Sequence, residues 1–320
     1  MANIINTLDC STGAKNVGFG SCVLDPKKII GAIEVPAGDF LSAANLASQT
    51  ALQTALLAKM TLDSPLLRWY PIYNFENIEP GSDALALQTM GYGGEYVVRE
   101  GYYKWLFQFV TGGLCLLKAL RTHNGTGKYY YFIDEKGVIY GRRSGAGLTS
   151  TLLPIPMQYF HAQPFDINTG AAISAYKLHF VFQQKYLNDF IGFVSTSDFD
   201  VTAIGGLQDV SIEAFSTLVA GVVKVQVFVG CDHTNLYDAY SAVLAVKANW
   251  VVKNKITGNA ITVTTDVVDA ANKAFTFTLD TADPDYPAAA ADLTMQLVAP
   301  TALATAGMPG YESNILTLTV

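Results

Sequence analysis

The sequence is short of charged residues. Only 15% of its 320 residues are Asp, Glu, Lys or Arg, whereas ordinary soluble domains carry roughly 25%. A chain with so little charge has difficulty covering its whole surface with charged groups, so we expect part of that surface to be buried against partner subunits. The alternative is a weakly charged monomer whose surface is rich in Thr, Ser and Asn.

Basic clusters and long apolar runs are also missing. The net charge is −7, and the basic pairs Lys27-Lys28 and Arg142-Arg143 are isolated, which argues against a protein that binds nucleic acid through its phosphates. No stretch approaches the roughly 18 apolar residues of a membrane helix, and residues 1–9 lack the pattern of a signal peptide. We therefore expect a soluble protein with no membrane partner, made in a cytoplasm.

Ligands for metals and partners for disulfides are few. The four cysteines lie at positions 10, 22, 115 and 231. They are too scattered for a disulfide framework, so we expect free thiols, although Cys10 and Cys22 could close a loop. The four histidines show no metal-binding spacing, and residues 231–233, Cys-Asp-His, offer at most two close ligands where zinc needs three or four. We predict a surface turn there, and neither a metal nor a cofactor.

No catalytic motif is present. The acids Asp280, Asp283 and Asp285 could bind calcium, but acids in a loop after a strand are ordinary turn formers and the spacing does not match an EF-hand. Residues 91–94 are rich in glycine yet lack the Lys-Ser/Thr of a phosphate loop and precede strand-like residues, so they predict a turn. No Gly-x-Ser-x-Gly nucleophile motif occurs. We predict that the protein is not an enzyme and has no catalytic residues.

Residues 129–143 predict a β-hairpin. Two runs of aromatic and β-branched residues, 129–133 and 138–140, flank the turn formers Asp134-Glu135-Lys136-Gly137, in which the glycine suits a positive φ. Because a lone hairpin is not stable in water, it requires a sheet around it. The neighbouring strands are equally aromatic, so we expect this hairpin to form the packed middle of the sheet.

The order of these signals predicts a mainly β protein. Residues 1–38 read as an irregular arm that contains one strand at residues 28–35. A long helix is expected at residues 40–60, capped by Asp39 or Ser42. It would lie on a mostly antiparallel sheet and complete an α+β domain over residues 39–203. After Phe199, Val, Thr and Ala replace the aromatics, and seven short strands predict an immunoglobulin-like β-sandwich over residues 204–320.

The chain resembles virion structural proteins of tailed bacteriophages. The resemblance is carried by Met1-Ala2-Asn3-Ile4-Ile5-Asn6, by residues 114–127 running into Tyr-Tyr-Tyr-Phe-Ile-Asp-Glu-Lys-Gly-Val-Ile-Tyr-Gly, and by Gly310-Tyr311-Glu312-Ser313-Asn314. It is most similar to a tail tube protein with a C-terminal immunoglobulin-like domain. The resemblance implies self-assembly into rings, possibly hexameric, or a tube. Other virion proteins would be partners, and DNA would pass through as non-specific cargo.

Other structural roles and a binding role stay open. A capsid auxiliary or decoration protein, or a head-tail connector, would share the sandwich and the low charge. A carbohydrate-binding adhesin would use Trp69, Tyr70, Tyr102 or Tyr103 as sugar platforms, whereas the alternative places the aromatics of residues 66–80 in a core. For assembly contacts we predict the flanks of the central hairpin, and charge reversal of the two arginines should impair assembly more than folding. The predicted interface residues are Thr122, His123, Asn124, Arg142 and Arg143.

Overall fold

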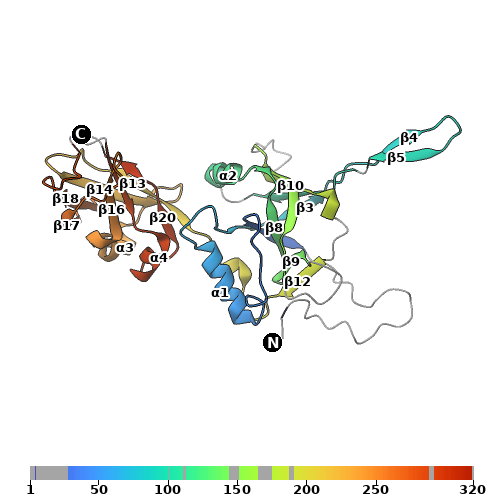
Figure 1. Ribbon diagram of the computed structural model, residues 1–320, viewed down its shortest axis with the longest axis horizontal. Coiled ribbons are helices and arrows are strands. Elements are labelled where there is room, and N and C mark those ends of the chain that lie inside the picture. Colours follow the sequence, from blue (N-terminus) through green and yellow to red (C-terminus); the bar gives the residue numbers. More distant parts are fainter. Residues whose placement is uncertain are drawn as a thin grey trace. The chain divides into compact units, whose positions relative to one another are not determined.

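The computed structural model describes residue 4 and residues 28–99, 101–110, 113–143, 151–164, 175–186, 191–287 and 292–318. Strands account for 43% and helices for 18% of the structure, and most strand pairs are antiparallel. The prediction of a mainly β protein with some helix is therefore confirmed. Figure 1 shows the elements in order along the chain.

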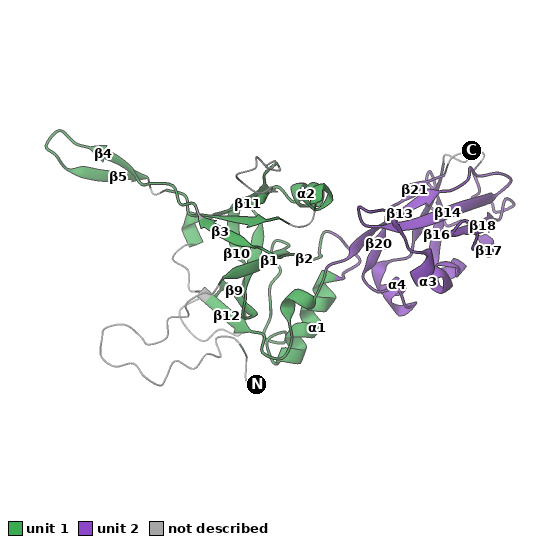
Figure 2. Cartoon of the chain, turned by 180° about the vertical axis from the view of Figure 1, so that it is seen from behind, with its two compact units in different colours: residues 1–60, 66–205 green, residues 61–65, 206–320 purple. Residues whose placement is uncertain are grey.

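The chain divides into two compact units, coloured separately in Figure 2. Unit 1 contains residues 1–60 and 66–205, and unit 2 contains residues 61–65 and 206–320. The division after Gly205 lies two residues from the domain boundary expected from composition. Residues 61–65 belong to unit 2, in which Asp63 accepts hydrogen bonds from the backbone N–H and the hydroxyl of Thr301, at 3.0 and 2.8 Å.

Unit 1 is built on one large sheet. Its strands run in the order β12-β9-β8-β10-β11-β6-β3, while β1 joins β8 to β2 and β7 joins β10. The elements of unit 1 are β1 Ile29–Val35, α1 Gln49–Met60, β2 Tyr70–Tyr73, β3 Asn77–Pro80, β4 Ala86–Thr89, β5 Glu95–Arg99, β6 Lys104–Phe109, α2 Gly113–Thr122, β7 Gly125–Thr126, β8 Tyr129–Asp134, β9 Val138–Arg142, β10 Ile155–Ala162, β11 Tyr176–Phe182, the 3-10 turn Gln184–Tyr186, β12 Ile191–Ser195 and the 3-10 turn Val201–Ala203.

Strand β8 is buried on both faces, as expected for the middle of a sheet. Tyr130 and Phe132 point into an aromatic core with Phe107 and Phe180. The alternate residues of β8 face a second core that is covered by α1. The predicted hairpin β8–β9 is confirmed, and Gly137 closes its turn with a φ of 76°.

Two expectations for the first 60 residues need correction. Helix α1 begins at Gln49 and not near residue 40, because the Ser48 hydroxyl accepts from the N–H of Ala51 and caps the helix there. Asp39 is not a cap, since its carboxylate binds Lys59 and the indole N–H of Trp69. The strand expected at residues 28–35 is confirmed as β1, which is a buried strand of the main sheet. Apart from Ile4, the part of the expected arm before residue 28 lies outside the described residues.

Unit 2 consists of two sheets that share one core. The larger has the order β17-β18-β14-β13-β20, with β15 on β14, and the smaller has the order β16-β19-β21. Alternate residues of β14 and β18 pack against alternate residues of β16 and β19. The elements of unit 2 are β13 Gln208–Ala214, β14 Val222–Val229, β15 Thr234–Asn235, α3 Tyr237–Leu244, the 3-10 turn Lys247–Asn249, β16 Trp250–Asn254, β17 Val263–Asp269, β18 Ala274–Leu279, β19 Leu293–Leu297, α4 Pro300–Thr305, β20 Tyr311–Ser313 and β21 Leu316–Thr317.

Candidate assembly surfaces

A second hairpin, β4–β5, projects from the sheet of unit 1 (Figure 1). It continues the pair β3–β6, because the N–H of Gly81 donates to Lys104 and the N–H of Asp83 donates to Tyr102. The carboxylate of Asp83 also lies 2.5 Å from the ammonium of Lys104. Backbone hydrogen bonds and an ion pair therefore fix the base of the hairpin to the sheet.

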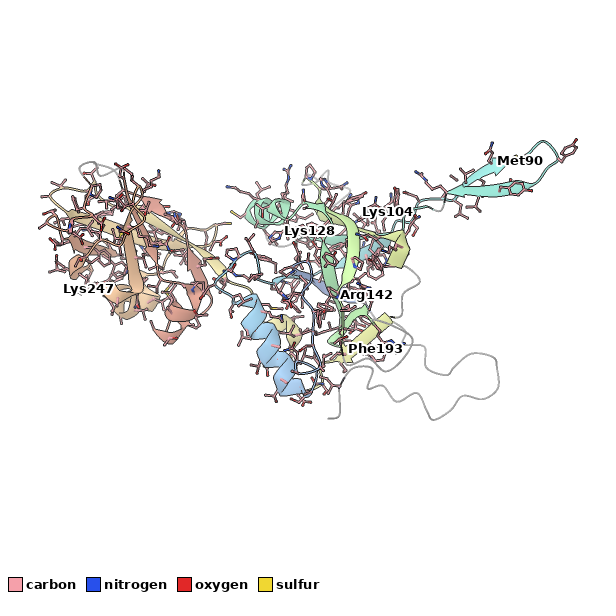
Figure 3. The ribbon with its side chains drawn as sticks, viewed as in Figure 1. Met90, Lys104, Lys128, Arg142, Phe193 and Lys247 are labelled. Atoms are coloured by element: carbon pink, nitrogen blue, oxygen red, sulfur yellow. The ribbon has the colours of Figure 1, made fainter. Side chains whose placement is uncertain are left out.

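The projecting hairpin is apolar yet exposed. On β5, Tyr96 is 61% and Val97 is 56% exposed, and Leu87 on β4 is 51% exposed. Figure 3 shows the side chains of this hairpin, with Met90 labelled, extending into open space. In the part of the chain that the structure describes, β4 and β5 pair only with each other. A solvated two-stranded hairpin is at best marginally stable, so this one is suited to contact another molecule.

The structure gives His123 and Asn124 internal contacts. Thr122 ends helix α2, and its hydroxyl donates to the carbonyl of Ala119. The side-chain carbonyl of Asn124 accepts from the N–H of Ala162 on β10. The segment before the central hairpin is therefore tied to the unit, because helix α2 ends at Thr122 and strand β7 begins at Gly125.

His123 belongs to a buried ionic cluster centred on Glu34. The Glu34 side chain lies on β1, and its residue is 7% exposed. Its carboxylate lies 3.0 Å from Nδ1 of His123, 2.5 Å from the ammonium of Lys128 and 3.0 Å from the hydroxyl of Tyr130. The ring of Tyr70 packs edge-on against His123. The cluster ties the end of α2 to strands β1, β2 and β8.

The protonation of this cluster follows from its contacts. Burial by itself would raise the pKa of Glu34, but hydrogen bonds and charge from His123 and Lys128 outweigh burial and hold this pKa below its ordinary value. Burial, together with the negative charge of Glu34 and the hydrogen bond to it, raises the pKa of Tyr130 well above its ordinary value. The cluster therefore contains an ionised carboxylate and a neutral phenol near neutral pH, and its role in the fold is to join elements.

The two predicted arginines lie apart from this cluster. Arg142 is the last residue of β9; its Nε donates to the carbonyl of Pro154 at 3.2 Å, and its guanidinium lies 4.6 Å from the centre of the Tyr186 ring. Arg143 follows the strand and is partly buried. Because Arg142 contributes to packing, reversing its charge should disturb folding, so that variant does not separate assembly from folding.

The described residues contain no group of three or more His, Cys, Asp or Glu side chains placed to hold a metal ion. The acids near residue 280 act as turn formers: Asp283 accepts from the N–H groups of Thr262 and Asp285. His233 lies in a turn and stacks on Phe228.

The expectation of free thiols is wrong for Cys115 and Cys231, because both are disulfide-bonded. Scattered spacing in the sequence carries no information about which side chains the fold brings within bonding distance.

Trp69, the first of the candidate sugar platforms, is fully buried. Its residue exposes 0% of its surface, its ring contacts Tyr131 and its N–H binds Asp39. The core interpretation of this aromatic is therefore confirmed, and Trp69 is not available to stack on a sugar.

Comparison with known proteins gives no assignment: no protein-family model and no curated protein matches the chain. Within the described residues, none of the helices is long and apolar enough to cross a membrane. The arguments for function therefore come from the surfaces of the molecule, and above all from the projecting hairpin.

Proposed function

We propose that this chain is a structural subunit of a phage particle that assembles with other copies of itself. The observation that carries the proposal is the β4–β5 hairpin, which presents apolar side chains to solvent and pairs with no other strand in the described part of its unit. Association removes such apolar area from water and supplies the neighbouring strand that an isolated hairpin lacks. The low proportion of charged residues fits a subunit whose surface is partly covered in the particle.

The more specific form of the proposal is a tail tube protein whose rings stack around passing DNA. Its support is the resemblance stated above, a mainly β architecture and the net charge of −7, which would keep DNA phosphates from binding to the wall. A capsid auxiliary protein or a head-tail connector is the alternative place for the same subunit. The virion, assembled in the host cytoplasm, is the proposed location.

Electron microscopy of the purified full-length chain, combined with light scattering over a range of concentrations, tests this function. Six-fold rings or tubes would support the tail tube, whereas small closed oligomers would favour the capsid or connector role. A protein that stays monomeric at the highest accessible concentration would overturn the assembly function in all its forms.

A further inference from the structure

Two histidines face each other across strands β10 and β11. The antiparallel pairing of these strands places His161 directly opposite His179. The N–H of Gln163 donates to the carbonyl of Lys177, and hydrogen-bonded pairs alternate along such a ladder, so residues 161 and 179 form the next hydrogen-bonded pair. The Cα atoms of such a pair are about 5.5 Å apart. Because directly opposed side chains lie on the same face of a sheet, the two imidazole rings can reach a common ligand.

The histidine pair lies on the outer face of the sheet of unit 1. The residues on either side of each histidine belong to the aromatic core. Since side chains alternate along a strand, both histidines lie on the face opposite to this core. His161 is exposed and His179 is half-buried. A small solute can therefore approach the pair from solvent.

The ring of His179 has a nitrogen that the described part of the chain leaves without a partner. Its Nε2 atom is buried and makes no hydrogen bond there. Nearly all buried polar atoms in proteins have a partner, so this nitrogen is suited to a ligand that the chain itself does not supply. The exposed side chain of His161 can change rotamer and turn its ring toward the same ligand.

The surroundings of the pair favour a neutral imidazole. Burial lowers the pKa of the His179 ring below its ordinary value. Positive charge on His161, Lys104 and Lys177 lowers this pKa further. A neutral imidazole binds a metal ion, whereas an anion requires the protonated ring, which the lowered pKa opposes. The charge of Lys104 is offset by the carboxylate of Asp83, 2.5 Å from its ammonium, which reduces its repulsion of a metal ion.

We propose that His161 and His179 together bind one divalent transition-metal ion, of the class of zinc, nickel and copper, through their ring nitrogens. Imidazole is a preferred ligand of these metals, whereas magnesium and calcium prefer oxygen. The described residues add no third His, Cys, Asp or Glu to the pair, so water or a group from another molecule completes the coordination. The two histidines lie on different strands, and their separation in the sequence therefore gives no sign of the pair. This site does not depend on the proposed self-assembly.

Metal titration of the full-length chain, purified without an affinity tag and treated with a chelator, tests the site. Isothermal titration with zinc chloride should show binding, and magnesium chloride should show none. His161→Gln and His179→Gln should each weaken zinc binding about tenfold or more, because each removes one of the two protein ligands. His233→Gln is the matched control, since it removes an exposed histidine from a turn and should leave the zinc affinity unchanged.

Several results would overturn the metal site. These are a wild-type chain that binds no zinc, zinc binding that survives both substitutions at the pair, and zinc binding that is lost in His233→Gln. The last result would place the metal at residues 231–233 instead.

Thermal unfolding distinguishes loss of the site from damage to the fold. Zinc should raise the Tm of the wild-type chain, because an ion bound only by the folded state stabilises that state. Without metal, His161→Gln should unfold at the wild-type Tm, since this residue is exposed, and zinc should then raise its Tm much less. A zinc-induced rise equal to that of the wild type would overturn the proposal. Stabilisation by phosphate and not by zinc would overturn it in favour of an anion site.

Discussion

The two hairpins of unit 1 have the same motif and opposite surroundings. Both consist of two short antiparallel strands joined by a turn with a glycine at positive φ. Hairpin β8–β9 has strands on both sides and a core on each face, whereas β4–β5 has none of these among the residues that the structure describes. The same hairpin motif therefore occurs in two settings, and its neighbours decide whether it stabilises the unit or is free to contact a partner.

The largest expected effect separates the two hairpins directly. Phe132→Ala in β8 removes a ring that contacts Phe107 and Phe180 in a close-packed core, and should lower the free energy of unfolding by about 3–5 kcal/mol. Tyr96→Ala in β5 should change it by about 0.5 kcal/mol or less, because its side chain faces solvent.

Urea unfolding measures both values, and hydrogen exchange resolved by peptide assigns each transition to unit 1. A loss at Tyr96→Ala as large as that at Phe132→Ala would show that the projecting hairpin is part of the fold and not a surface added to it.

The turn of the central hairpin should be the next most sensitive position. The buried carboxylate of Asp134 accepts from the N–H groups of Lys136 and Val138 and from the hydroxyl of Tyr140. Asp134→Ala leaves these donors without their acceptor and should lower the free energy of unfolding by about 3 kcal/mol. Thermal or urea unfolding measures this loss. Glu135→Ala in the same turn is the control and should be close to neutral, since Glu135 is exposed.

The glycines of the two turns sharpen the comparison further. Gly137 and Gly93 have φ values of 76° and 84°, yet a Cβ at Gly137 would lie 2.5 Å from the hydroxyl of Thr196, while one at Gly93 meets nothing within 4 Å. Gly137→Ala should therefore cost about 2 kcal/mol of global stability. Gly93→Ala should only loosen the tip, visible as faster local hydrogen exchange with an unchanged unfolding midpoint. If Gly93→Ala lowered the unfolding midpoint as much as Gly137→Ala, the distinction between the two hairpins would be contradicted.

Local sequence patterns predicted these strands well, because the preference for a strand depends mainly on the residues within that strand. The strand expected at residues 28–35 is β1, and the turn formers from Asp134 to Gly137 placed β8–β9. The predicted start of α1 was wrong because Ser42 and Ser48 are both possible caps, and in the structure the Ser48 hydroxyl accepts from the N–H of Ala51. Helix α2 was not identified, although Leu117 and Leu120, which are buried, have helical spacing.

The candidate surface could not be predicted from the sequence for a different reason. Glu95 to Arg99 has the composition of any strand, and nothing in five residues shows whether another strand covers them. Likewise, the contact between Glu34 and His123 joins residues 89 positions apart, which no local pattern records. Burial and isolation are properties of the whole fold.

The smallest expected effect is a dependence of the free energy of unfolding on pH. It should come from Glu34, whose strand β1 pairs with β8 of the central hairpin, and not from the projecting hairpin. The pKa of Glu34 is lower in the folded chain than in the unfolded chain, so ionised Glu34 contributes stability above its unfolded pKa. That contribution is lost as the pH falls through its folded pKa. Between about pH 5 and pH 3 the wild-type free energy of unfolding should therefore fall more steeply than that of Glu34→Gln. Glu135→Gln, which removes an exposed carboxylate from a turn, should keep the wild-type slope. If Glu34→Gln retained the full slope as well, the acid sensitivity of unit 1 would have to come from other carboxylates.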